Sequence, residues 1–284
     1  MLVLEVGLGG RLDAVNVLDA DVAVITSIGL DHAEWLGRKR SDVAREKAGI
    51  ARAGRPVIIG ERNRPAALDQ AISGTGAIPL RAGRELRWRR TSRGLNLNLA
   101  GHVLRGVRPG IAGVHQHGNA ACAALAARLL GQRLAIDDDA IRAGLAAARI
   151  RGRFERIARH PEVIVDVAHN PAAARTLKAM LREHPVASRA VIAVLGDKDV
   201  AAIGRALGDE FIEWFAAGLP GPRMRSGEEL AKALAAAPVA GRVEALESVP
   251  QALDRALSRS LADERVVVFG SFQTVAAACR HLNQ

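Results

Sequence analysis

The second half of the sequence alternates apolar runs with helical patterns, and this alternation limits the chain to few folds. Five apolar runs of strand length occupy residues 163–167, 190–195, 211–216, 243–246 and 266–269. Strands that alternate with helices in this way form a parallel, doubly wound, Rossmann-like sheet. Ligands of such sheets gather at the carboxyl ends of the strands, so the loops at 166–170 and 197–199 are the first candidates for a site.

Helix starts in this half carry recognisable signals. Ser226 with Glu229, and Ser248 with Gln251, fit the capping-box spacing, in which each side chain satisfies a free backbone amide. Pro171 suits the first turn of a helix, where no amide donor is needed. These signals place helices directly after the predicted strands.

The first half begins with the same alternation and then changes character. Strands are predicted at 2–6, 22–26 and 56–59, with helices that begin near Ser41 and at Pro65. Short alternating runs between 85 and 109 predict antiparallel hairpin strands at the edge of that sheet. Asn119 is expected to open a further helix, and Asp137 to cap the one after it. We place a domain boundary near 149–152, which gives domains at 1–149 and 150–284.

A glycine-rich turn follows the first predicted strand. Glu5 lies among apolar residues of that strand, and a buried carboxylate is costly unless it is paired or bound to a cation. Gly7, Gly9 and Gly10 allow close backbone approach, and Arg11 and Asp13 follow at once. The alternatives are a functional turn, or simply a strand, a loop and a surface ion pair.

Composition excludes some classes of protein and leaves others open. The net charge is +10, but only five of the 40 basic residues are lysines and aromatic residues make up 3%. Scattered arginines without aromatic stacking residues do not indicate nucleic-acid binding, although the positive field suits polyanionic substrates. No apolar run reaches membrane-spanning length, and we expect no secretory leader. Cys122 and Cys279 are expected to be two buried thiols in a reducing cytoplasm.

The motifs, taken in order, resemble the folylpolyglutamate synthase/dihydrofolate synthase family of the Mur ligase superfamily. They cover nearly the whole chain. They are the glycine turn, the Asp-His pair at 31–32, and the segments at 45–50, 119–121, 152–154, 166–171, 197–199 and 270–272. The resemblance implies an α/β fold: a partial central ATPase-type domain at 1–149, then a Rossmann-like C-terminal domain.

The resemblance assigns a metal and catalytic role to three residues of the first half. Glu5 and His32 match residues that hold Mg²⁺ near the ATP phosphates, whereas from the residues alone a structural pair is the alternative. Lys47 matches a lysine that is carbamylated, a reaction that needs an uncharged primary amine and that arginine cannot replace. The alternative is a surface lysine beside Glu46. His32 and Lys47, together with Lys198, are the predicted catalytic residues.

Nucleotide and substrate contacts are implied by other matching positions. Asn119 matches an adenine contact, although an N-cap is its alternative role. Arg153, Asp166 and His169 match contacts to ATP, with Asp166 placed to accept from ribose hydroxyls, and all three are expected to converge on the cleft between the domains, facing Asn119. Lys198 belongs to an Asp-Lys-Asp loop whose alternative is a solvated charge cluster.

Ser271 is the predicted edge of the glutamate pocket. Two departures stand near these positions: residues 114–118 replace the family's Leu-Pro lead-in, and Gln273 stands where many members have histidine.

The resemblance predicts an ATP-dependent amide ligase that adds L-glutamate to dihydropteroate, to folate polyglutamates, or to both, through an acyl phosphate. ATP and Mg²⁺ are the expected cofactors. The chain is expected to be a monomer that acts on small molecules, with no nucleic-acid or membrane partner. Another Mur-type amino-acid ligase, or a non-catalytic fragment or subunit, stays open. The sequence has no Gly-Lys dipeptide and thus no P-loop motif. We therefore expect a C-terminal portion of the enzyme, inactive by itself.

Overall fold

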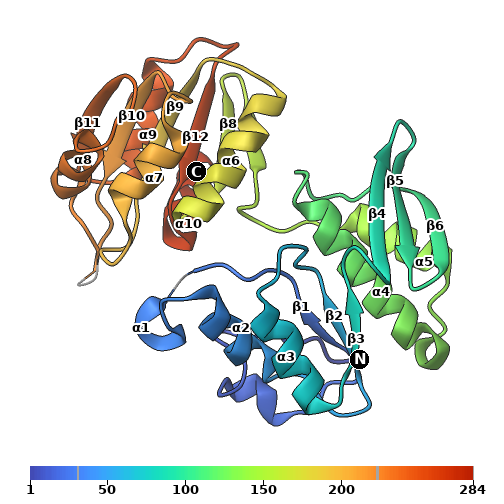
Figure 1. The fold of residues 1–284 in the computed structure, drawn as a ribbon. Coiled ribbons are helices and arrows are strands. Elements are labelled where there is room, and N and C mark those ends of the chain that lie inside the picture. Colours follow the sequence, from blue (N-terminus) through green and yellow to red (C-terminus); the bar gives the residue numbers. More distant parts are fainter. Residues whose placement is uncertain (31, 222–223, 284) are drawn as a thin grey trace. The chain divides into compact units, whose positions relative to one another are not determined.

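A computed structural model describes residues 1–30, 32–221 and 224–283 (Figure 1). The chain divides into two compact units, Met1–Arg149 and Ile150–Gln284. Each unit has its own hydrophobic cores, and each is described by itself. Among the described residues, none of the helices combines the length and the apolarity that crossing a membrane requires.

The first unit contains a parallel sheet in the order β1-β2-β3. Its strands are β1 (Ala23–Ile25), β2 (Pro56–Ile59) and β3 (Ile78–Arg81). The central strand is buried on both sides: Val57 and Ile59 pack in a core with α2 (Arg40–Ala48) and α3 (Ala66–Thr75), and Ile58 packs in another with α4 (Gln116–Leu134). Burial on both faces is the reason this strand reads as a continuous apolar run. Two short elements, η1 (Ala14–Val17) and α1 (Ala33–Leu36), complete this part of the unit.

The predicted strand at 2–6 is wrong. Residues 1–6 are irregular, and the side chains of Leu2 and Val3 are 70% and 81% exposed. An isolated strand has nothing to satisfy its backbone groups, so an apolar sequence alone does not make one. Among the described residues, no strand pairs with this segment.

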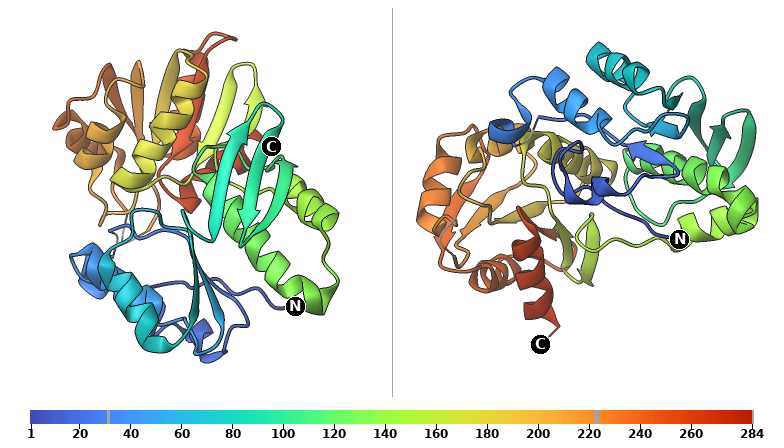
Figure 2. Two further views of the ribbon diagram at one scale, coloured as in Figure 1. Left: turned by 45° about the vertical axis from the view of Figure 1, so that its right-hand side comes forward. Right: turned by 90° about the horizontal axis from the view of Figure 1, so that it is seen from below.

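A second, antiparallel sheet follows within the first unit. Its strands are β4 (Leu86–Thr91), β5 (Gly94–Leu99) and β6 (His102–Val107), as the alternating pattern predicts. They form a sheet of their own, so their placement at the edge of the parallel sheet is corrected. Alternate leucines point toward α4 and α5 (Asp138–Ala147), which lie behind the sheet (Figure 2, left).

Helix boundaries in the first unit match the expected caps only in part. Asp137 caps α5 by accepting a hydrogen bond from the Ala140 amide. Asn119, however, lies inside the first turn of α4, which begins three residues earlier, so it is not the N-cap. Ser41 also lies inside its helix, whose N-cap is Lys39. Polar residues within the first turn carry the same sequence signal as true caps, and this explains the two errors.

The second unit is a six-stranded sheet in the order β11-β10-β9-β12-β8-β7. Five parallel strands match the predicted apolar runs: β8 (Glu162–Asp166), β9 (Ser188–Ile192), β10 (Glu213–Ala217), β11 (Arg242–Leu246) and β12 (Arg265–Phe269). The sixth, β7 (Glu155–Arg159), runs antiparallel to β8 and was not predicted. Its sequence, Glu-Arg-Ile-Ala-Arg, is too polar to read as a buried strand.

Helices cover both faces of this sheet. One core packs α6 (Pro171–Glu183), α7 (Val200–Leu207) and α8 (Gly227–Ala235) on one face. The other packs α9 (Val249–Ser258) and α10 (Phe272–Leu282) on the opposite face (Figure 1). The capping box of Ser226 and Glu229 is formed in full, whereas Ser248 caps α9 without a reciprocal bond from Gln251. The fold is therefore the doubly wound arrangement that the alternation predicts.

The two cysteines differ. Cys122 is buried, and burial raises the pKa of its thiol to about 12, so it stays protonated. Cys279 is only partly buried, which corrects the expectation of two buried thiols.

Candidate functional site

The glycine-rich turn of the first unit is seated on the end of α2. Within the turn, Asp13 accepts hydrogen bonds from the amides of Leu8 and Val15, at 2.9 and 3.0 Å. The Arg11 amide donates to the Glu46 carbonyl at 2.9 Å, and the two side chains form an ion pair at 3.1 Å. The turn is thus closed by its own carboxylate and fixed to the helix by its arginine.

Gly10 is required by the close contact between the turn and the helix. A Cβ at this position would stand 2.7 Å from the Glu46 carbonyl oxygen and 3.1 Å from Lys47 Cα. Neither atom belongs to a flexible side-chain end, so any other residue would push the turn away. The motif therefore sets the position of the turn against the backbone of Lys47.

Lys47 lies in the last turn of α2 and is half-buried. Burial lowers the pKa of its ammonium group, because the charged form loses hydration. This environment differs from that of a fully solvated surface lysine. The arrangement raises the neutral fraction of this amine at a given pH, and the neutral form is the one that reacts with carbon dioxide.

The two predicted metal ligands do not form a metal centre as they stand. Glu5 is exposed on the irregular first segment, so the adjacent strands that were expected to carry it and His32 are not both present. His32 is exposed with φ +50°, and its carbonyl accepts from the amides of Trp35 and Leu36 at the start of α1. Its neighbour Asp31 lies outside the described residues. Across the part of the chain that the structure describes, no three His, Cys, Asp or Glu side chains are grouped to hold an ion.

Asn119 belongs to a short polar chain at the first turn of α4. Its amide nitrogen donates to Gln116 Oε1 at 2.9 Å, and Gln116 Nε2 lies 3.0 Å from His115 Nε2. Beside this chain, Gly118 packs against the ring of Trp88, where a Cβ would stand 3.1 Å from Cζ2. The first turn of α4 therefore presents hydrogen-bonding groups from residues that are fixed by one another.

In the second unit, Asp166 ends β8 and accepts two backbone hydrogen bonds. The amides of Phe154 and Ala168 each donate to one carboxylate oxygen at 2.8 Å. The Val167 amide donates in turn to the Gly152 carbonyl at 2.9 Å. The strand end thus fixes the Gly-Arg-Phe segment at 152–154, and Arg153, exposed within it, is held near the carboxylate.

Burial raises the pKa of the Asp166 carboxyl, since the charged form is poorly hydrated there. The two amide donors and the positive charge of Arg153 act in the opposite direction. A carboxyl with both oxygens already accepting from the backbone is mainly an organiser of this loop, and it can still accept from a ligand hydroxyl through remaining lone pairs.

His169 and Asn170 lie between this strand end and α6. His169 Nδ1 stands 2.8 Å from the Val167 carbonyl oxygen. Because that oxygen can only accept, Nδ1 is protonated and donates the hydrogen bond. Asn170 caps α6 by accepting from the Ala173 amide at 2.9 Å. The predicted loop is therefore held at both ends by the backbone.

Lys198 is not part of a solvated charge cluster. Its side chain is 9% exposed, and its ammonium lies 3.2 Å from Asp197, while Asp199 caps α7. Sequence reasoning missed Arg225, which donates to the carbonyls of Gly196 and Lys198 at 2.8 and 3.4 Å and so holds the Asp-Lys-Asp loop. Nothing in its local sequence signals this contact, because it comes from a segment 27 residues further along the chain.

Ser271 is buried at the start of α10. Its hydroxyl accepts from the Thr274 amide at 3.0 Å and lies 2.7 Å from Thr274 Oγ1, which donates to the Ala193 carbonyl at 2.6 Å. Thr274, not identified from the sequence, therefore ties the end of β12 to the end of β9. Gly270 makes this contact possible, because a Cβ there would stand 2.2 Å from the same carbonyl.

The register of the sheet brings these loops to one edge. Phe269 of β12 pairs with Asp166 of β8 on one side and with Ile192 of β9 on the other. The segments at 166–170, 197–199 and 270–271 follow these three strands, so they lie side by side at the carboxyl edge of the sheet. This is the edge at which doubly wound sheets bind ligands. The predicted convergence with Asn119 concerns both units and stays a prediction.

Comparison with known proteins supports this doubly wound α/β fold and identifies the family. Residues 152–272 match the family model described as Mur ligase, glutamate ligase domain. Dihydrofolate synthase/folylpolyglutamate synthase of Escherichia coli (strain K12) is 41% identical over 278 residues, which are 97% of this chain and 63% of that protein.

Two solved structures extend the likeness. The E. coli FolC protein in complex with DHPP and ADP has a TM-score of 0.90 at 39% identity, over 98% of this chain and 65% of that one. The bifunctional folylpolyglutamate synthase/dihydrofolate synthase of Yersinia pestis, complexed with AMPPNP and a Mn ion, gives 0.87 at 36%, over 98% and 65%. The chain belongs to the dihydrofolate synthase/folylpolyglutamate synthase family of Mur ligases. It spans just under two thirds of the length of these relatives.

Proposed function

We propose that the chain serves in ATP-dependent ligation of L-glutamate to dihydropteroate, to folates that already carry glutamate, or to both. The observation that carries the proposal is the row of loops at the carboxyl edge of β8, β12 and β9. It falls within the segment that matches the glutamate ligase domain. Relatives named for both synthase activities, and crystallised with adenine nucleotides, support the same reading.

The reaction has two steps, and each step forms one bond between heavy atoms as it breaks another. The γ-phosphoryl group of ATP passes to a substrate carboxylate and leaves ADP, and the amino group of glutamate then attacks the acyl phosphate. An amide forms, phosphate leaves with the bonding electron pair, and the amine loses a proton. The protein's task is to position the reactants and to neutralise their charge.

Roles follow for the residues of the site. Asn119 contacts adenine, Asp166 accepts from the ribose, and Arg153 and His169 contact phosphate. Lys198 supplies a poorly hydrated positive charge at the sheet edge, where it stabilises a developing negative charge better than a solvated lysine can. Ser271, already bonded within the protein, shapes the glutamate pocket through the loop it caps.

The divalent metal that the relatives use is a separate part of the proposal. Bound metal neutralises phosphate charge. Glu5 and His32 are its proposed ligands here, and they supply at most two of the groups that a metal shell needs. The described residues do not complete that shell.

A cytoplasmic location and a monomeric state complete the proposal. The free thiols of Cys122 and Cys279 and the requirement for ATP support the location, whereas the monomeric state stays a prediction from the sequence.

The proposal is tested in a chimera, in which this chain replaces the region of the E. coli relative that it matches. The chimera is expected to release ADP when dihydropteroate, glutamate, Mg²⁺ and ATP are all present. Lys198→Ala is expected to lower that rate by about 100-fold or more, and Lys232→Ala, a lysine on α8, serves as the matched control. The chain alone is assayed in parallel, and we expect no turnover from it. The assignment would be refuted by a folded chimera whose rate of ADP release does not depend on dihydropteroate or folate. It would also be refuted if Lys198→Ala left that rate unchanged.

A further inference from the structure

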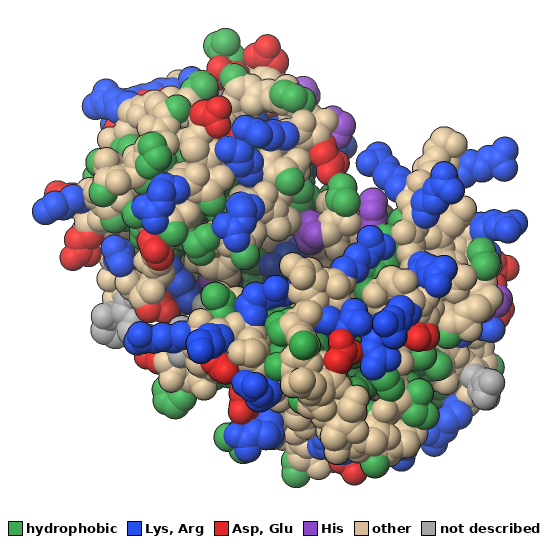
Figure 3. Space-filling model, in the orientation of Figure 1, with side chains coloured by type: hydrophobic (Ala, Val, Ile, Leu, Met, Phe, Trp, Pro, Cys, Tyr) green, Lys and Arg blue, Asp and Glu red, His purple; other side chains and the backbone are tan. Residues whose placement is uncertain are grey.

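The antiparallel sheet of the first unit concentrates positive charge. Between residues 84 and 108 the sequence has seven arginines and a single acidic residue, Glu85. Basic side chains project over β4, β5 and β6 (Figure 3). The expectation of scattered arginines is therefore incorrect for this surface, which lies outside the candidate site of the second unit.

The pleat divides the sheet into an apolar face and a cationic face. Leucines on alternate positions pack against α4 and α5. The residues between them point the other way, and the register pairs Arg87 with Asn98 and Arg89 with Asn96. Arg105 is exposed on β6, next to these rows. The outward face thus carries three arginines and two asparagines, with the exposed Val103 opposite Asn98.

This face offers hydrogen-bond donors and almost nothing to accept them. Asn96 Oδ1 accepts from the Gly106 amide at 3.1 Å, and Asn98 Oδ1 accepts from the Gly101 amide at 2.9 Å. Because each Oδ1 already accepts from a backbone amide, the NH₂ group of each side chain is what it can offer to a ligand. Arg87 donates one hydrogen bond, to the Arg84 carbonyl.

Among the residues that the structure describes, these arginines have no carboxylate partner. Within the described ranges, Arg87, Arg89 and Arg105 form no ion pair, unlike many arginines elsewhere in the chain such as Arg52 and Arg81. The nearby Glu85 accepts from the Arg81 amide at 2.8 Å. A donor-only, positively charged face complements a ligand that is rich in acceptors and negative charge.

We propose that the outward face of β4, β5 and β6 is a binding surface for a glutamate oligomer, the kind of chain that a folate polyglutamate carries. This assignment rests on the proposed function. Guanidinium groups bind carboxylates in a bidentate fashion, and the asparagine NH₂ groups suit the carbonyls that link successive glutamates. Same-face positions on β4 are about 6.7 Å apart, within reach of successive carboxylates because arginine side chains are long.

Single-stranded nucleic acid fits this face less well. Such ligands stack their bases on exposed aromatic rings. The only aromatic residue of the sheet, Trp88, has the opposite parity on β4, packs against Gly118, and lies under Arg62 at 4.0 Å. The outward face therefore offers charge and hydrogen bonds without a stacking platform.

The test is a titration of the full chain with a fluorescent γ-linked pentaglutamate, followed by anisotropy in the absence of nucleotide and metal. We expect saturable binding that weakens as salt is raised. The combined Arg87→Gln, Arg89→Gln, Arg105→Gln variant is expected to bind about tenfold more weakly, as three lost exposed charge pairs imply.

A second triple variant changes net charge by the same amount elsewhere. Arg205, Arg242 and Arg280 are exposed arginines of the second unit without an ion pair among the described residues, and their replacement by Gln should leave binding within about twofold. An equal loss of affinity in both triple variants would show that only the overall positive charge attracts the ligand, and it would overturn the proposal. So would absence of binding, or tighter binding of an oligothymidylate of equal charge to the same face. Because nucleotide is absent, these outcomes are independent of whether the ligase assignment holds.

Discussion

The surroundings of Lys47 change the protonation of its side chain. It is one of five lysines among 40 basic residues, and it stands where the glycine turn contacts the last turn of α2. Burial lowers the pKa of its amine. At a given pH, a larger fraction is neutral than for a solvated lysine, and only the neutral form becomes a carbamate.

We therefore expect Lys47 to take up carbon dioxide preferentially. In the presence of ¹³C-labelled bicarbonate at mildly alkaline pH, NMR should show a carbamate signal that Lys47→Arg abolishes. Lys232→Arg, made on α8, should leave the signal in place. A carbamate signal that persists in Lys47→Arg would mean that this lysine is not the modified one.

Asp166 makes a second prediction at this scale, through pH. Burial raises the pKa of its carboxyl in the folded protein above the ordinary value of 3.8. The native state therefore holds the proton more tightly than the unfolded state does. The corresponding stability is present below the unfolded pKa and is lost as the pH rises through the folded pKa.

Asp166→Asn removes this titration, because an amide does not ionise. As the pH is raised above the ordinary carboxyl pKa of 3.8, the free energy of unfolding of the wild type should decline relative to that of the variant. Chemical denaturation at several pH values measures the difference, and Asp254→Asn, an exposed aspartate, controls for loss of a carboxylate in general. Parallel pH profiles for wild type and Asp166→Asn would contradict the expectation.

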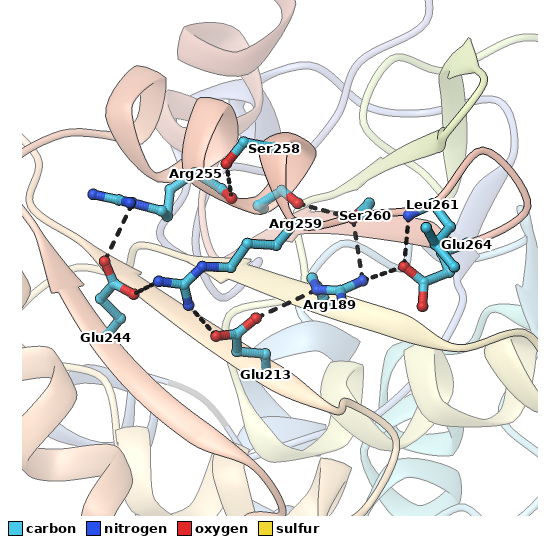
Figure 4. A network of polar contacts seen from close by, with 10 residues as sticks. Arg189, Glu213, Glu244, Arg255, Ser258, Arg259, Ser260, Leu261 and Glu264 are labelled. Atoms are coloured by element: carbon cyan, nitrogen blue, oxygen red, sulfur yellow. Dashed lines mark hydrogen bonds and ion pairs between the residues drawn. The ribbon is translucent and has the colours of Figure 1, made fainter.

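At the scale of elements, an ion-pair network ties α9 to the strands beneath it, away from the candidate site (Figure 4). Glu213 of β10 pairs with Arg189 of β9 at 3.3 Å and with Arg259, which caps the end of α9. Arg259 also reaches Glu244 of β11 at 2.8 Å, and Arg189 contacts Glu264. Three strands and one helix end are thus joined through charges.

Glu213→Gln should weaken this junction. Arg189 and Glu213 are 12% and 15% exposed, so the variant removes a negative charge from beside the poorly hydrated Arg189 and the half-buried Arg259. Loss of one partner of a fully buried pair costs about 3–5 kcal/mol, and with this residual exposure we expect about 1–3 kcal/mol in the free energy of unfolding.

Arg255→Gln is the matched control for that measurement. Its side chain is 51% exposed where it meets Glu244, so its replacement should cost about 0.2–1 kcal/mol. Urea denaturation compares the two variants. If both cost the same, the network is an ordinary set of surface pairs.

At the scale of the whole molecule, the two units should differ in stability. The second unit has a six-stranded sheet with a closed core on each face. The first unit has two three-stranded sheets and leaves Met1, Leu2 and Val3 largely exposed. Exposed apolar side chains contribute little to stability and promote association.

We expect calorimetry of the full chain to resolve two transitions. A fragment of residues 150–284 should fold by itself and unfold at the higher of the two temperatures, because its cores are formed within it. Circular dichroism and amide NMR dispersion verify that the fragment is folded. A fragment that is disordered, or a single cooperative transition of the full chain, would show that the units depend on each other.

The sequence by itself determined the five parallel strands of the second unit, the caps at Asp137 and Ser226, and the hairpin strands of the first. These features are local: they depend on apolar periodicity and on side chains that bond to nearby amides. The motifs also identified the family and therefore the candidate site residues, because each motif is a short local stretch and the motifs occur in the family's order.

Only the tertiary structure decided the rest. The apolar segment at 2–6 has no strand partner, β7 forms although it reads as polar, and the antiparallel strands separate into their own sheet. Burial of Lys47 and Lys198, and the contacts of Arg225 and Thr274 with distant carbonyls, likewise have no local signal. Strand pairing and side-chain burial depend on which segments meet in space. Residues far apart in the chain provide the hydrogen-bond partners, and their packing excludes water from the buried side chains.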